Sequence, residues 1–121
     1  MANDNTTILV SQARTATENS RDILNRNAKG CHIILDVTSV TATPSIVVTI
    51  QGKDNLSGKY YTILSGSAVT GTGTTVYKIY PGITASANVS ASDVLPGVWR
   101  VSVSHADTDS ITYSVSANMV D

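Results

Sequence analysis

The chain has 121 residues, a formal net charge of −1 and hydrophobic residues at 41% of its positions, with no phenylalanine. This length allows one domain that buries about two-thirds of the surface of its unfolded chain. The near-zero charge argues against a dedicated nucleic-acid surface, which needs clustered Lys and Arg, and no stretch approaches the roughly 20 apolar residues that span a bilayer.

Cys31 is the single cysteine, so no disulfide can form within the chain. This cysteine usage is typical of proteins that fold in a reducing compartment. Residues 1–20 lack the basic and then apolar layout of a secretory signal. We therefore expect the protein to be made in the cytoplasm.

The N-terminal segment, residues 1–28, is polar and its few apolar residues follow no clear period. A helix over residues 20–28 is one interpretation. We favour an extended arm or an edge strand, because Ile23 and Leu24 alone make a poor helical stripe. Such an arm lies either against its own sheet or against a neighbouring subunit. Residues 29–121 are expected to form a single β-sandwich domain.

Strict alternation of apolar and polar residues follows, as in Ile46, Val48 and Ile50. A period of two places one set of side chains on a buried sheet face and the other in water. The expected strands are 31–40, 45–52, 60–64, 74–80, 98–105 and 110–119. We expect the first two to pair as a hairpin and residues 83–93 to form a surface excursion. About seven or eight strands, with the edge strand included, indicate an antiparallel β-sandwich, Ig-like or jelly-roll-like.

The sequence offers no residue set for catalysis, a cofactor or a metal. His32 and His105 are the only histidines, and a zinc site takes three or four ligands. Cys31 is adjacent to His32, so their side chains face opposite sides of a strand. Asp107 and Asp109 bring only two carboxylates to their turn, whereas calcium takes six to eight oxygens. We therefore expect that the protein is not an enzyme.

Exposed tyrosines are the more informative residues. Tyr60 and Tyr61 are neighbours on one expected strand, so one of them faces outward; Tyr77 and Tyr80 likewise fall on opposite faces of another. An outward tyrosine suits a protein interface or a carbohydrate platform, because it combines apolar area with a hydroxyl. We favour an interface; packing at the rim of the core and sugar binding are the alternatives.

Several runs resemble those of small virion proteins of tailed bacteriophages. They are 48–54 (VTIQGKD), 57–62 (SGKYYT), 80–82 (YPG), 93–96 (DVLP), 99–101 (WRV) and 112–115 (TYSV). The similarity covers about residues 14–120. It implies a capsid decoration or cement protein that binds the outside of the phage head after synthesis in the host cytoplasm. Its implied partners are the major capsid protein and copies of itself, as a dimer or trimer.

On this interpretation, Arg14, Arg21 and Arg26 are the first candidates for contacts with the capsid or a sister copy. Tyr60 and Tyr77 are the second. Two alternatives stay open: another virion component, such as a tail or neck protein, and a carbohydrate-binding β-sandwich module. A gene beside that of the major capsid protein favours decoration, and a gene among tail genes does not.

Overall fold

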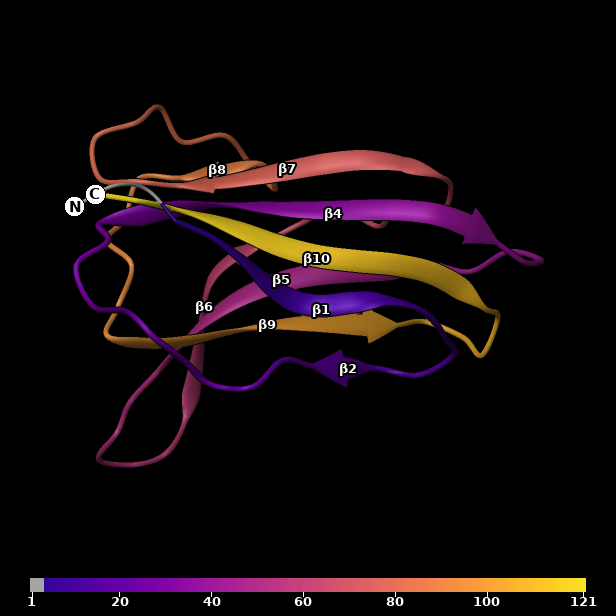
Figure 1. The fold of residues 1–121 in the computed structure, drawn as a ribbon, viewed down its shortest axis with the longest axis horizontal. Coiled ribbons are helices and arrows are strands. Elements are labelled where there is room, and N and C mark those ends of the chain that lie inside the picture. Colours follow the sequence, from indigo (N-terminus) through magenta and orange to yellow (C-terminus); the bar gives the residue numbers. More distant parts are fainter. Residues whose placement is uncertain (1–3) are drawn as a thin grey trace.

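The computed structural model describes residues 4–121. These residues form ten strands and no helix, arranged in two sheets that pack together (Figure 1). The strands are β1 (Asp4–Arg14), β2 (Glu18–Asn19), β3 (Ile23–Leu24), β4 (Gly30–Val40), β5 (Ile46–Lys53), β6 (Tyr60–Ser65), β7 (Gly73–Ile79), β8 (Ser90–Ala91), β9 (Val98–His105) and β10 (Ile111–Val120). The all-β prediction is confirmed. A search of the described residues finds no helix able to cross a membrane.

Each of the two sheets formed by residues 4–121 has five strands. Sheet A has the order β1-β10-β4-β7-β8, and sheet B has the order β2-β9-β5-β6, with β3 also paired to β9. Neighbouring strands are antiparallel except for the parallel pair β7 and β8. The arrangement is consistent with a β-sandwich.

The number of strands exceeds the expected seven or eight. The additional strands β2, β3 and β8 have two residues each. A two-residue strand is too short to establish an alternating pattern, and its hydrogen bonds come from distant partners such as β9. The sequence pattern therefore could not predict these strands.

The expected hairpin between residues 31–40 and 45–52 is wrong. β4 pairs with β10 and β7 in sheet A, whereas β5 pairs with β9 and β6 in sheet B. The turn between β4 and β5 carries the chain from one sheet to the other, and its Thr41 N–H donates to the Ser110 carbonyl. Both strands bury one face, so their apolar and polar residues alternate in the same way in a hairpin and in two facing sheets. The alternation therefore could not show that the two strands belong to different sheets.

The N-terminal segment contributes to both sheets. β1 runs antiparallel to β10 from Asp4 opposite Met119 to Arg14 opposite Ile111, with two register shifts. The chain then crosses to sheet B, where β2 and β3 both pair with β9. Residues 4–24 therefore lie against the two sheets of their own domain, and residues 20–28 form no helix.

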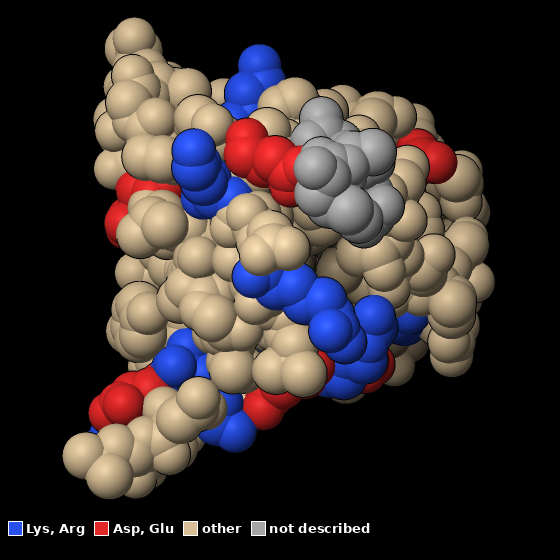
Figure 2. Space-filling model, turned by 60° about the vertical axis from the view of Figure 1, so that its left-hand side comes forward, with Lys and Arg blue, Asp and Glu red and all other residues tan. Residues whose placement is uncertain are grey.

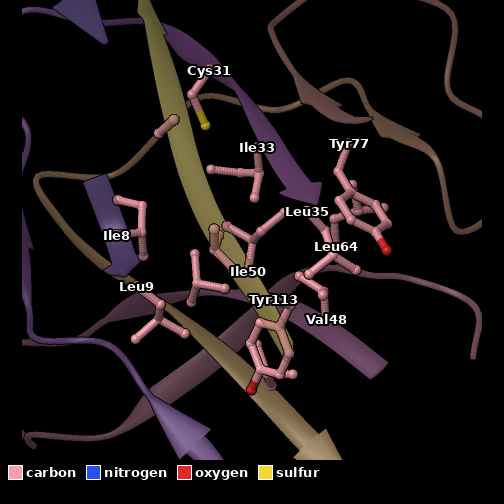
Figure 3. Close-up of a cluster of buried hydrophobic side chains, with 14 of the residues drawn as sticks. Ile8, Leu9, Cys31, Ile33, Leu35, Val48, Ile50, Leu64, Tyr77 and Tyr113 are labelled. Atoms are coloured by element: carbon pink, nitrogen blue, oxygen red, sulfur yellow. The ribbon is translucent and has the colours of Figure 1, made fainter. Parts of the chain in front are cut away.

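The core lies between the sheets (Figure 3). Alternate residues of β5, including Val48 and Ile50, are buried along the whole strand. β4 and β10 contribute the same pattern from sheet A. The largest side chains in this core are Trp99, Tyr77 and Tyr113. The other alternate residues of these strands point away from the core, and the surface described next includes residues of this outer face from sheet B.

Candidate interaction surface

Asp22, between β2 and β3, connects two side chains on the outer face of sheet B. The ammonium group of Lys53 donates to Asp22 Oδ2 at 2.8 Å, and the hydroxyl of Tyr60 donates to Asp22 Oδ1 at 2.6 Å. Lys53 and Tyr60 are directly opposite each other on β5 and β6, so their side chains share one face. The Lys53 and Tyr60 hydrogen bonds lower the pKa of Asp22, and the Asp22 carboxylate raises the pKa of Lys53.

Arg100 completes this group from β9. Its guanidinium carbon lies 3.5 Å from the centroid of the Tyr60 ring, and its Nε donates to Gln51 Oε1 at 2.8 Å. The positive guanidinium is attracted to the face of the aromatic ring. We call Asp22, Gln51, Lys53, Tyr60 and Arg100 the Asp22 cluster. Because Arg100 covers one face of Tyr60, that face is not free to stack on a sugar.

A groove of about 470 Å³ adjoins the cluster, and Asp22 lines it. Its walls come mainly from residues 21–28, with Met119 among the residues from other strands. The side chain of Asn25 donates to the carbonyls of Ala28 and Leu95, which holds this segment in place. The hydrogen bond from Asn25 to Leu95, which are 70 residues apart in the sequence, therefore helps to fix the shape of the groove.

Arg21 and Arg26 line the same groove. Both are exposed, and Arg21 donates to the Thr7 carbonyl at 3.3 Å. Figure 2 brings the left-hand end of Figure 1 forward, and Lys and Arg side chains lie across the middle of this face with Asp and Glu side chains beside them. Three of the predicted interface residues, Arg21, Arg26 and Tyr60, thus belong to one surface, joined through Asp22.

Arg14, the other predicted contact residue on the N-terminal segment, lies outside the groove and is buried, which disfavours its predicted contact with a partner. Its side chain is only 8% exposed and donates to the carbonyls of Tyr113 at 2.9 Å and Val10 at 2.7 Å. The guanidinium carbon also lies 4.7 Å from the centroid of the Tyr113 ring. Arg14 therefore fastens the end of β1 to β10.

Replacement of Arg14 by methionine should destabilise the fold by about 2 kcal/mol, because carbonyls near the end of β1 lose a charged donor. Urea denaturation measures this change. The exposed Arg26→Met variant is the control and should stay within about 0.5 kcal/mol of the wild type. Equal unfolding midpoints for the two variants would contradict the fastening role.

Tyr77, the other tyrosine named as a candidate for contacts with a partner, is 2% exposed and lies in the core. Its ring packs against Gly66, where an added Cβ would come within 2.6 Å of a ring carbon. Burial raises the pKa of the Tyr77 hydroxyl. Tyr80, on the opposite face of the chain, donates instead to the Asp121 carbonyl. Tyr77 cannot contact a partner without disruption of the core.

The histidines and the cysteine are separate from the surface around Asp22. Cys31 is fully buried, and burial raises its pKa to about 12. His105 Nε2 lies 3.1 Å from the Tyr113 hydroxyl. Within residues 4–121 there is no group of three or more His, Cys, Asp or Glu side chains able to hold a metal ion.

His105 should make stability depend on pH. Burial, and then the nearby Arg14 charge, lower its pKa from the ordinary value of 6.5. Below that pH the unfolded chain binds the proton more readily, so the stabilising contribution is present above it and is lost as the pH falls through the folded-state pKa. We expect the free energy of unfolding to fall between about pH 7 and pH 5 more steeply in the wild type than in His105→Asn. Identical pH slopes for the two proteins would contradict this.

The loop between β5 and β6 was expected from its turn-forming residues, but its exposed leucine was not singled out as a surface feature. Leu56 at this loop is 96% exposed. The Asp54 carboxylate accepts from the Leu56 N–H at 3.2 Å and the Ser57 hydroxyl at 2.8 Å, and the Gly58 N–H donates to the Asp54 carbonyl at 2.7 Å. These bonds define the loop backbone independently of any partner. A leucine inside the turn-forming run Asp-Asn-Leu-Ser-Gly was the available signal.

Comparison of the chain with protein-family models, curated proteins and solved structures finds no match.

Proposed function

We propose that this chain is a capsid decoration or cement protein of a tailed bacteriophage. It binds the outer surface of the assembled head through the Asp22 cluster and the adjoining groove. The major capsid protein is the partner, and many copies attach to each particle.

One observation carries the proposal. The resemblance runs 48–54, 57–62 and 99–101 each contribute a solvent-facing residue to the same place: Lys53, Tyr60 and Arg100 all belong to the Asp22 cluster. Runs that lie far apart in the sequence therefore converge on one surface. Arg and Tyr are the residue types that protein interfaces favour.

Cementing follows from mass action. A protein that binds the assembled shell, and has little affinity for its separated subunits, shifts the equilibrium toward assembly. The ionic network of the Asp22 cluster holds Tyr60 and Arg100 in fixed positions, which reduces the side-chain entropy lost on binding. Repetition of a modest contact over a symmetric shell produces strong reinforcement.

Co-sedimentation tests the proposal. Phage particles grown without this gene are mixed with the purified protein, and intact heads, isolated tails and dissociated capsid protein are compared. We expect binding to heads, with little to tails or to dissociated subunits. Binding to tails alone would favour a tail or neck component instead.

A charge-matched pair of variants locates the contact. Arg21→Gln combined with Arg26→Gln should weaken head binding by roughly three- to tenfold, since exposed ionic contacts contribute up to about 1 kcal/mol each. Lys29→Gln combined with Lys59→Gln removes the same charge at exposed positions that do not line the groove and should leave binding within about twofold. Equal effects would show that the groove is not the contact.

A further inference from the structure

The β5–β6 loop presents an apolar side chain without local cover. The loop projects from the body of the molecule, at the lower left in Figures 1 and 2. The Asp54 carboxylate accepts hydrogen bonds from Leu56 and Ser57 within the loop, and Leu56, at 96%, is the most exposed of the large hydrophobic residues that the structure describes. A preformed loop with one apolar anchor loses little conformational entropy when that anchor is buried by a partner.

A pocket of matching size lies at the other sheet. It has a volume of about 180 Å³ and lies where β4 begins and where β7 and β10 end. Its lining is mostly apolar, with Ile79, Ile83 and Val120 among the contributing residues, and Lys78 and His32 also line it. An apolar cavity of about 150 Å³ accommodates a benzene-sized group, so a leucine side chain fits.

Loop and pocket cannot meet within one molecule. Figure 1 places the β5–β6 loop at the lower left, whereas the start of β4 and the end of β7 lie in the upper part of the view. We propose that Leu56 of one copy inserts into this pocket of a second copy, in a head-to-tail contact. Such a contact joins two different surfaces and therefore generates rings or chains of copies. This inference holds whether or not the chain binds a capsid.

Charge supports a second copy as the occupant. Asp54 is two residues from Leu56, and its hydrogen bonds to Ser57 and Leu56 lower its pKa, so it is ionised at neutral pH. Lys78 forms no salt bridge among the described residues. The only opposite charges that this contact brings together are Asp54 and Lys78, since Lys59, which also flanks the loop, has the same sign as Lys78. Burial of the leucine side chain therefore contributes more to the binding free energy than this ion pair.

The contact is small, so association in solution should be weak. Stable interfaces generally bury more than about 1,000 Å², which one loop tip does not provide. On a surface that already concentrates the copies, the same contact becomes effectively intramolecular and is far more populated.

Cysteine cross-linking tests the contact at low affinity. Asn55→Cys, which keeps Leu56, and Lys78→Cys are made in separate chains, mixed and oxidised, with Leu24→Cys plus Lys78→Cys as the matched control. All three positions are exposed, so the variants should fold, and the buried native Cys31 does not compete. We expect roughly tenfold more disulfide-linked dimer from the Asn55 pair than from the control pair, which is the factor that burial of the retained Leu56 side chain produces.

Each outcome decides the inference. A yield of disulfide-linked dimer equal to that of the Leu24→Cys control pair overturns the inference. Equally efficient dimers from Asn55→Cys alone also overturn it, because they require two loops to meet symmetrically. Sedimentation velocity over a range of concentrations should show association of the wild type that is roughly tenfold weaker for a Leu56→Ala chain. Equal association of the two chains would contradict the role of the side chain.

Discussion

Trp99→Ala should lower the free energy of unfolding by about 3–5 kcal/mol, the range for truncation of a large buried aromatic side chain. Trp99 is fully buried in β9, where it lies opposite Gly52 of β5 and Ile23 of β3. Its loss leaves a cavity between strands that hold the N-terminal segment against sheet B. Urea denaturation monitored by circular dichroism measures the change.

A second variant separates packing from hydrogen bonding. The indole N–H of Trp99 has no hydrogen-bond partner among the described residues, so stabilisation at this position comes from packing. Trp99→Phe keeps most of that packing and should destabilise by about 1–2 kcal/mol. A Trp99→Phe protein as unstable as Trp99→Ala would show that the indole N–H has a partner and would contradict this account.

Gly30→Ala should destabilise the fold by about 3 kcal/mol, the upper end of the range for an overpacked core. Gly30 begins β4, and a Cβ there would lie 1.9 Å from the Ile79 carbonyl oxygen and 2.9 Å from the Tyr80 Cα. Both atoms belong to the backbone, so no side-chain rotation relieves the clash. β4 and β7 would have to separate where they pair.

Gly71→Ala is the matched control, because no atom lies within 4 Å of its added Cβ. It should leave the thermal unfolding midpoint unchanged or slightly raised, since alanine restricts the unfolded chain. If Gly30→Ala unfolds at the same temperature as Gly71→Ala, the close approach of β4 and β7 is wrong.

Local pattern predicted six of the longer strands, β4, β5, β6, β7, β9 and β10, but not their partners. The alternation of Ile46, Val48 and Ile50 is reproduced as alternate burial along β5. The same alternation gave no information on which sheet β5 joins, because that depends on how the turn after β4 is directed. Pairing of β1 with β10 joins the two ends of the sequence, and no local signal encodes it.

The candidate surface was predicted in part, for a related reason. Arg21, Arg26 and Tyr60 were named from exposure and residue type, and the fold brings them to one region through Asp22. Arg14 looked equivalent in sequence, but its N–H groups donate to carbonyls of Tyr113 and Val10, and its charge is paired with Glu18. Arg100 was missed as a site residue because its contact with Tyr60 depends on the order of strands in sheet B.

Imaging of phage heads by cryo-electron microscopy, with and without this protein, tests the proposed function most directly. We expect density for a compact β-domain on the outer surface, repeated at the local symmetry axes and absent from particles grown without the gene. Heads of identical appearance in the two preparations, or density confined to the tail, would contradict a decoration role.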